Sequence, residues 1–346
     1  MPNIMLTYRC NLHCPYCFAN DYVNRFDTDI SEENFDYAVD FIVKGGYHQI
    51  GLIGGEPTLH PLFEKFIQKL TKKEGVSSVM LYTNGMYLSK FEKLSFDPQV
   101  TSMMKILVNC NSPKQIGEAN YKKFIQTMDA VFTHYYMGSN IKFGINLYDN
   151  DFDYSYIKEI LTRYDQHHVR ISLTVPDFSK EPDVSPLDQF RKRKDYLLEF
   201  LHEMDEIGVL AYMDCNKVPL CVWTDKEFQW LIDYQKRYPK MKSNLTSGIV
   251  GCSPVVDIHP DLRADRCFGM SGYSNVNIRD FMRMADLENY FKQNVDYIMY
   301  RIPAETKCVK CYERQTARCS GGCPGYKQKK IEKINRTADE VGSAGI

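Results

Sequence analysis

The sequence lacks an excess of charge of either sign, and this absence bears on its partners. It has 346 residues, with 43 Lys and Arg against 44 Asp and Glu, for a formal net charge of −1. Nucleic acids and anionic membranes both attract an excess of positive charge, so bulk electrostatics favour neither as the main partner. We therefore predict a chain that binds no nucleic acid and no membrane.

Long apolar runs are also lacking. No uninterrupted apolar stretch approaches the roughly 20 residues that span a bilayer, and the first residues lack the basic region and apolar core of a signal peptide. The length exceeds one typical domain, and 44% hydrophobic residues suffice for a substantial core. We predict a cytoplasmic protein with one large and one small domain.

What the chain holds in excess is cysteine, with twelve residues. Disulfides are disfavoured in a reducing compartment, so metal ligation is the better interpretation. Three cysteines lie in an N-terminal loop, Cys110 stands alone, and eight follow late in the chain. Eight cysteines are enough for two sites of four ligands each. These late cysteines are Cys215, Cys221, Cys252, Cys267, Cys308, Cys311, Cys319 and Cys323.

The N-terminal loop has the spacing C-x3-C-x2-C, formed by Cys10, Cys14 and Cys17. Three thiolates can hold three irons of a four-iron four-sulfur cluster and leave the fourth iron open. Structural zinc and iron–sulfur sites normally take four protein ligands, so three thiolates predict a catalytic site that something else completes. The alternative is a zinc knuckle that includes His13, whose ring would have to fold back because it is adjacent to Cys14.

Alternating strand-like and helix-like patterns predict parallel βα units over residues 4–207. One helix pattern begins at Phe35, repeats at helical spacing and closes at Gly45. Six units predict an α/β fold, a partial (βα)6 TIM-like barrel short of the eight units of a full barrel. The expected strands are Ile4–Arg9, Gln49–Gly54, Ser78–Thr83, Lys105–Asn109, Ile141–Leu147 and Val169–Thr174.

Alternation within the later strands predicts which side chains face the barrel interior. Ile106 and Val108 should pack on the helices, and Cys110 should continue that buried side as a small hydrophobe rather than serve as a hydrogen-atom donor. The opposite side chains are polar, so they are candidates for binding a cofactor or substrate, or are simply solvated strand ends. These interior candidates are Lys105, Asn109, Lys142, Asn146, Arg170 and Ser172.

The composition shifts after about residue 208. A helix is expected near Lys226–Tyr238, and Gly, Pro and Cys then become frequent. Such a cysteine-rich segment folds around metals more readily than around an apolar core. We predict a barrel domain over 1–208, a cysteine-rich iron–sulfur domain over 209–330 and a polar tail over 331–346.

Three motifs in order along this barrel resemble those of radical S-adenosylmethionine (SAM) enzymes. The first is the cysteine loop, including Tyr16 before its last cysteine. The second is Gly54-Gly55-Glu56-Pro57 after the second strand, and the third is Tyr82-Thr83-Asn84-Gly85 after the third. Each turn alone is unspecific, but their order is specific, and the resemblance covers roughly residues 4–207.

The resemblance implies the chemistry and its residues. Cys10, Cys14 and Cys17 would ligate a four-iron four-sulfur cluster whose open iron is chelated by S-adenosylmethionine, and the reduced cluster would generate a 5′-deoxyadenosyl radical that removes hydrogen from the substrate. Glu56, with the Gly54 and Gly55 backbone, would bind the cofactor's amino group. The expected cofactor contacts are therefore Tyr16 near the adenine, Gly54, Gly55, Glu56 and Asn84, together with Asn109, Asn146, Arg170 and Ser172 from the barrel interior.

The late cysteines resemble the SPASM subgroup of this family, whose usual pattern is C-x2-C-x5-C-x3-C. Here the last four are spaced C-x2-C-x7-C-x3-C, and Cys252 and Cys267, with Ile258-His259-Pro260 between them, resemble the upstream element. Asp261 stands where a Gly is expected, and no cysteine follows Cys323.

By analogy, two auxiliary four-iron clusters are expected. One takes Cys252, Cys267 and Cys323, and each cluster is completed by Cys215 or Cys221. The other takes Cys308, Cys311 and Cys319. The alternatives are a single auxiliary cluster of the twitch type, or structural zinc.

The subgroup implies that the radical acts on a peptide or protein residue, as in maturation of ribosomal peptides by cross-linking, oxidation or epimerisation. The alternative is a radical dehydrogenase or epimerase of a small molecule such as an aminoglycoside or sugar, and a third is a non-enzymatic electron-transfer or zinc scaffold. Expected partners are a reductant such as flavodoxin or ferredoxin and, because the first strand begins at residue 4 and leaves no N-terminal recognition domain, a separate peptide-recognition protein.

Overall fold

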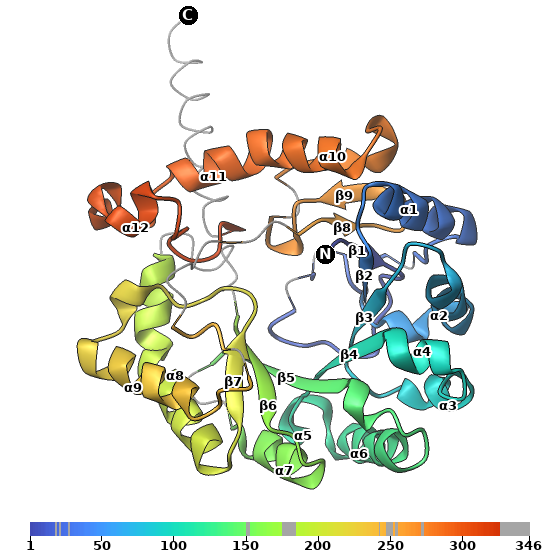
Figure 1. The fold of residues 1–346 in the computed structure, drawn as a ribbon, viewed down its shortest axis with the longest axis horizontal. Coiled ribbons are helices and arrows are strands. Elements are labelled where there is room, and N and C mark those ends of the chain that lie inside the picture. Colours follow the sequence, from blue (N-terminus) through green and yellow to red (C-terminus); the bar gives the residue numbers. More distant parts are fainter. Residues whose placement is uncertain are drawn as a thin grey trace, which may run out of the picture.

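The fold is taken from a computed structural model, and Figure 1 shows its parallel strands curving with helices on their outer side. Of the helices that the structure describes, none combines the length and the apolar character that a bilayer span requires. The predicted tail over 331–346 lies outside the described residues. The structure describes residues 1–17, 19–20, 22–26, 28–149, 153–174, 185–241, 243–246, 252, 255–270 and 273–325.

The strands form one sheet in the order β10-β9-β8-β1-β2-β3-β4-β5-β6-β7. Strands β1 to β7 pair in parallel, β8 also pairs in parallel with β1, and β9 and β10 continue antiparallel from β8. The bounds are β1 Asn3–Met5, β2 Gln49–Ile53, β3 Ser78–Thr83, β4 Met104–Asn109, β5 Ile141–Leu147, β6 His168–Leu173, β7 Leu210–Met213, β8 Asp257–Ile258, β9 Arg263–Asp265 and β10 Asn275–Asn277.

The helices follow the strands as βα units. Helix α1 begins where the Ser31 hydroxyl caps the Asn34 amide at 3.1 Å and ends at Gly45, as predicted. Later in the chain, α10 continues through a π-helical segment, η7, into α11. The bounds are α1 Glu32–Lys44, α2 Phe63–Lys72, α3 Phe91–Leu94, α4 Pro98–Met103, α5 Pro113–Ile116, α6 Glu118–Thr133, α7 Ser155–Arg163, α8 Pro186–Glu206, α9 Asp225–Lys236, α10 Met284–Phe291, η7 Lys292–Asp296, α11 Tyr297–Arg301 and α12 Tyr312–Gln315.

The partial α/β barrel is confirmed, with differences at its ends. The first strand ends at Met5, because from Thr7 onward the chain pairs with residues 28–30 instead. A seventh parallel strand, β7, follows the six predicted ones; its four residues are too few to show a periodic pattern. This strand and β8 join the barrel sheet from beyond residue 208, and the domain boundary there stays a prediction.

The register places the predicted interior side chains on one face of the sheet, which we call the inner face. Gly144 pairs with both Asn109 and Arg170, and Arg170 pairs with Tyr212, so these positions share a face. The alternate positions Ile106 and Val108 are buried, as predicted. On the inner face, Lys105 and Lys142 are exposed, and Asn109, Asn146, Arg170 and Ser172 are half-buried.

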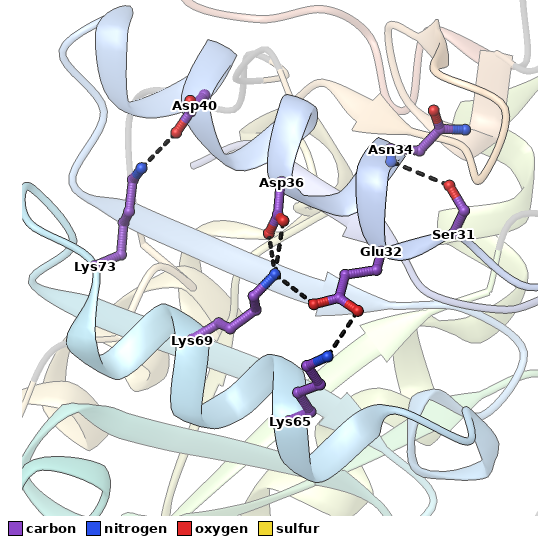
Figure 2. Close-up of polar contacts among 8 residues, drawn as sticks. All are labelled: Ser31, Glu32, Asn34, Asp36, Asp40, Lys65, Lys69 and Lys73. Atoms are coloured by element: carbon purple, nitrogen blue, oxygen red, sulfur yellow. Dashed lines mark hydrogen bonds and ion pairs between the residues drawn. The ribbon is translucent and has the colours of Figure 1, made fainter.

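A row of ion pairs joins α1 to α2 on the outside of the barrel (Figure 2). Lys69 contacts Glu32 at 2.8 Å and Asp36 at 2.6 Å, and Lys65 contacts Glu32 at 2.7 Å. The two lysines lower the pKa of Glu32 to about 2. Such exposed pairs stabilise little individually, so burial of the apolar helix faces mainly holds α1 against α2.

Candidate active site

The three N-terminal cysteines lie together in the loop that follows β1. Burial raises the pKa of Cys10 to about 12 and that of Cys14 to about 11, and it also raises the pKa of Cys17. Each added negative charge opposes the next, since Cys10 is coupled to both other thiols and to Glu56. Thiolates gathered in so unfavourable a place need a bound cation to stay ionised, and this donor set fits an iron–sulfur cluster.

Two asparagines that the sequence analysis missed hold this loop. The Cys10 amide donates to Asn24 Oδ1 at 2.8 Å, and Asn24 adopts a φ of 58°, which Asn tolerates better than most residues. Asn111, two residues beyond β4, accepts through Oδ1 from the Tyr16 hydroxyl and from Cys14 Sγ at 3.7 Å. The position of Asn111 just beyond a parallel strand is a signal that could have found it, because ligands bind at that edge.

The two glycines of the second motif are required by a close approach of backbones. The Gly55 amide donates to the Thr7 carbonyl and the Glu56 amide to the Arg9 carbonyl, both at 2.8 Å. A Cβ on Gly54 would lie 2.6 Å from the Thr7 oxygen, and one on Gly55 would lie 2.3 Å from the Arg9 oxygen. The motif therefore fixes the backbone from which Cys10 projects.

Gly55→Ala should displace Arg9 and with it Cys10, at a cost of roughly 1–3 kcal/mol in stability, and most of the iron bound by the first loop should be lost. Iron content and urea unfolding measure the two effects. Gly208→Ala is the control, because its Cβ would meet nothing within 4 Å and its φ of +72° adds backbone strain away from the loop. Equal iron in both variants would contradict the expectation.

Glu56 joins the second motif to the third. Its carboxylate is 1% exposed and accepts from Thr58 N at 3.1 Å, from Thr83 Oγ1 at 2.7 Å and from Asn84 N at 2.8 Å, besides the Thr58 hydroxyl. Burial raises the pKa of Glu56, and these donors oppose the rise. The predicted contact of Glu56 with the cofactor's amino group stays a prediction.

The third motif returns to the first through asparagine side chains. Asn84 Nδ2 donates to Asn11 Oδ1 at 2.9 Å, and Asn11 Nδ2 contacts Met86 Sδ at 3.2 Å. The cysteine loop, the Gly-Gly-Glu turn and the Thr-Asn-Gly turn thus form one closed hydrogen-bonded unit. Three segments that are separate in sequence position the three thiols together.

Polar groups from β5, β6 and the end of β7 meet on the inner face. Arg170 Nε donates to Asp214 Oδ1 at 2.9 Å and Arg170 Nη1 to Asn146 Oδ1 at 3.2 Å. Burial would lower the pKa of Arg170, yet Asp214 raises it above its ordinary value. Asp214, which the sequence analysis missed, is 43% exposed and directly precedes Cys215.

Other predicted cofactor contacts lie on or beside this face. Ser172 pairs in register with Asn146. The buried Oδ1 of Asn109 has no hydrogen-bond partner among the described residues. Tyr16 lies with its ring 5.6 Å from that of Tyr148. These positions suit a polar ligand, and the individual roles stay predictions.

The strongest electrostatic couplings of the late cysteines divide them into two sets of four. Cys267 is coupled to Cys323 and Cys252, and Cys323 is coupled to Cys215 and Cys252. A Cβ on Gly269 would lie 3.6 Å from Cys323 Sγ and 3.7 Å from Cys267 Sγ, so these two thiols face one small space. We call Cys215, Cys252, Cys267 and Cys323 the first set.

The second set consists of the remaining late cysteines. Cys221 is coupled to Cys308 and Cys311, and Cys319 is coupled to all three. This grouping agrees with the predicted division, in which Cys215 completes one set and Cys221 the other. Whether each set holds a cluster stays a prediction.

All twelve cysteines are thiols in this structure. Among the described residues, no three His, Cys, Asp or Glu side chains are close enough to hold one metal ion. A four-iron cube carries its thiolates at separate corners and needs a wider spacing than one ion does. Cys110 belongs to neither set; it is 2% exposed beneath the inner face, as predicted.

A buried polar chain connects the first loop with the first set. His259 Nδ1 lies 2.8 Å from the Tyr8 hydroxyl, and His259 Nε2 lies 2.8 Å from Asp265 Oδ2. Tyr8 precedes Cys10 by two residues, and Asp265 precedes Cys267 by two. His259 thus holds β8–β9 against the first cysteine loop.

Asp257 beside this chain should make stability depend on pH. It accepts from Asn3 Nδ2 at 2.7 Å and from Phe268 N at 3.0 Å, and burial raises its pKa from 3.8 to about 6. A raised pKa in the folded state means that stability is lost as pH rises through about 6.

As the pH rises from 4 to 8, the unfolding free energy of Asp257→Asn should therefore increase by about 2–3 kcal/mol relative to that of the unsubstituted protein. The lost hydrogen bond lowers the stability of the variant by the same amount at every pH. The test is therefore how the stability difference between the two proteins changes with pH. Urea unfolding at several pH values measures it. A constant difference between the two proteins would contradict the ionisation of Asp257.

Comparison with known proteins agrees with this geometry. Residues 4–111 match the family described as the Radical SAM superfamily. In solved structures, the chain is similar to Streptococcus suis SuiB bound to S-adenosylmethionine, with TM-score 0.60 and 15% identity over 93% of this chain and 72% of that one. It is similar to native anSMEcpe with bound AdoMet, with TM-score 0.59 and 18% identity over 98% and 99%.

Sequence relatives are named as GTP 3′,8-cyclases. The GTP 3′,8-cyclase of Aquifex aeolicus is 24% identical over 220 residues, or 62% of this chain, and that of Limosilactobacillus fermentum is 30% identical over 92 residues, or 26%. The chain spans 59% and 28% of their respective lengths. The motifs and the family match agree on one conclusion, that residues 4–111, which hold all three motifs, are similar to the Radical SAM superfamily.

Proposed function

We propose that this chain is a radical SAM enzyme that modifies a residue of a peptide or protein. The observation that carries the proposal is the arrangement of eleven cysteines as one three-thiol loop and two four-thiol sets. An open catalytic cluster and two closed auxiliary clusters are the contents that fit these sets. When bound, S-adenosylmethionine and the catalytic cluster supply a carbon radical that removes hydrogen from the substrate.

The chain's own residues bind the cluster and the cofactor and orient the substrate. Cys10, Cys14 and Cys17 hold the cluster, and the Gly-Gly-Glu turn places the cofactor. On the inner face, Arg170, Asp214 and Asn146 offer both donors and acceptors, which suits the amides and carboxylates of a peptide. The two sets of late cysteines would each hold an auxiliary cluster, which would supply electron transfer from the substrate radical or an anchor for the substrate.

The substrate class rests on the subgroup and on the fold. Two similar structures are of proteins with peptides, SuiB with its precursor peptide SuiA at TM-score 0.59 and anSMEcpe with AdoMet and the Cp18Cys peptide at TM-score 0.57. Identities of 14% and 17% make these similarities of fold. A flavodoxin or ferredoxin would supply the electron, and a separate protein could present the peptide.

A second candidate is a small-molecule substrate. The curated relatives favour it, because they are GTP 3′,8-cyclases. The exposed Lys105 and Lys142 on the inner face would suit a phosphate-bearing or other anionic molecule. A small-molecule dehydrogenase or epimerase acting on a sugar or aminoglycoside remains within this candidate.

The test is anaerobic incubation of the iron-loaded protein with S-adenosylmethionine and a reductant, with detection of 5′-deoxyadenosine. Peptide libraries, aminoglycosides and GTP are then compared in deuterated form for label transfer into 5′-deoxyadenosine. Transfer from peptides supports the first proposal, and transfer from GTP or aminoglycosides supports the second. No 5′-deoxyadenosine from fully loaded protein would contradict both and favour an electron-transfer scaffold.

A further inference from the structure

A buried arginine lies beside the first cysteine set. Arg266 directly precedes Cys267, is 1% exposed, and its Nε donates to Asp296 Oδ1 at 2.7 Å. Arginine is almost never fully buried without an anionic partner. Asp296 is one such partner, and Cys252 and Cys267 are two more when they are ionised, since their charges also raise the pKa of Arg266.

The helix formed by η7 and α11 contacts both Arg266 and Cys252. Asp296 is the last residue of the π-helical segment η7, and Tyr300, one turn later in α11, donates its hydroxyl to the Cys252 carbonyl at 2.9 Å. The same face of one continuous helix therefore contacts Arg266 and the backbone of Cys252. Figure 1 shows α10 and α11 as one long helix lying alongside β9. Single-turn π segments in α-helices occur frequently at functional sites.

In the second set, neither Cys221 nor Cys319 has a buried cation among its strongest electrostatic neighbours. The cations coupled to Cys221 are Lys307 and Arg191, whose side chains are 57% and 36% exposed. Solvent screens exposed charges and leaves buried ones effective. The two sets therefore differ in the fixed charge that surrounds them.

The first set is also the one that adjoins the inner face. Cys215 follows Asp214, which forms the ion pair with Arg170. The other charged side chain coupled to this set is Asp257, through Cys267. A cluster in the first set would thus lie next to the proposed substrate position, with two largely buried cations near its ligands. Arg266 adjoins Cys267 in the chain, and Arg170, whose side chain is 13% exposed, acts on Cys215 but is paired with Asp214.

We propose that Arg266 raises the reduction potential of a cluster held by the first set above that of a cluster held by the second. The inference rests on the proposed function, in which each set holds a four-iron cluster. Reduction adds one negative charge to a cluster, and a nearby buried cation stabilises the reduced form more than the oxidised form. Asp296 limits this effect by neutralising part of the Arg266 charge. Arg266 acts as a positioning residue for charge and touches no substrate.

The test is a redox titration followed by electron paramagnetic resonance. The full chain carries Ala at Cys10, Cys14 and Cys17, so that only auxiliary clusters contribute signals. Arg266→Gln should shift the midpoint potential of one cluster to more negative values and leave the other unchanged. Asp296→Asn should shift the same cluster in the opposite direction, and Arg266→Lys should stay near the unsubstituted value.

A merely structural role would move both variants the same way or cause both to lose iron. Unchanged potentials in an iron-replete Arg266→Gln, or shifts of the same sign in Arg266→Gln and Asp296→Asn, would overturn the inference. If Arg266→Gln fails to hold iron, Asp296→Asn decides, because it keeps the cation. Failure of the proposed function is separate: iron that is unchanged after Cys252→Ala/Cys267→Ala would show that the first set holds no cluster.

Discussion

Replacing Cys10, Cys14 and Cys17 together with Ala should lower the iron content of anaerobically purified protein from about twelve to about eight atoms per chain and abolish cleavage of S-adenosylmethionine. The other nine cysteines of the chain lie outside the loop that follows β1, so none of them is expected to replace these three ligands. Iron and sulfide analysis with electron paramagnetic resonance measures the loss.

Cys110→Ala is the matched control for this variant. It removes a buried thiol that belongs to no set, so iron should stay at about twelve atoms. A fall from about eight to about four in the triple variant would indicate a single auxiliary cluster. Zinc with little iron would contradict the radical proposal.

The second large effect concerns the division of the late cysteines. Cys252→Ala/Cys267→Ala should remove the first auxiliary cluster and leave about eight irons per chain. In that background, Cys215→Ala should remove no further iron, because its set is already lost. Cys221→Ala should lower the iron toward about four and change the remaining auxiliary signal, because Cys221 belongs to the second set.

The Cys215→Ala and Cys221→Ala variants are matched controls for each other, since both cysteines are exposed and both lie outside the C-terminal motif. Iron analysis of the two triple variants side by side is the measurement. The reverse result, with Cys215→Ala lowering the iron and Cys221→Ala neutral, would exchange the two residues between the sets. Equal losses would indicate that the clusters share ligands.

Local patterns predicted six of the parallel strands of the barrel. β3 and β5 match their predicted bounds, and Cys110 is buried as the alternation of β4 required. The four residues of β7 carry too little pattern. Asn24 and Asn111 escaped prediction because their contacts with the cysteine loop join residues that are far apart in the sequence.

Tertiary contacts also explain why the site was only partly predicted. The resemblance to the SPASM pattern predicted Cys252, Cys267 and the last four cysteines as ligands, but it left open which set Cys215 and Cys221 complete. That choice depends on where β7 ends, and β7 was not predicted. The roles of Asp214 and Arg266 likewise depend on their contacts with Arg170 and Asp296, which no local pattern shows.

The pairing of β8 with β1 has a consequence for how the chain folds. The paired residues Asn3 and Asp257 are 254 positions apart, so one edge of β1 has no strand beside it until most of the chain has been synthesised. Contacts between residues so distant in sequence form slowly during folding, and an open strand edge can pair with another chain. A barrel truncated at residue 208 would keep this edge open, and aggregation during biosynthesis would then compete with cluster insertion.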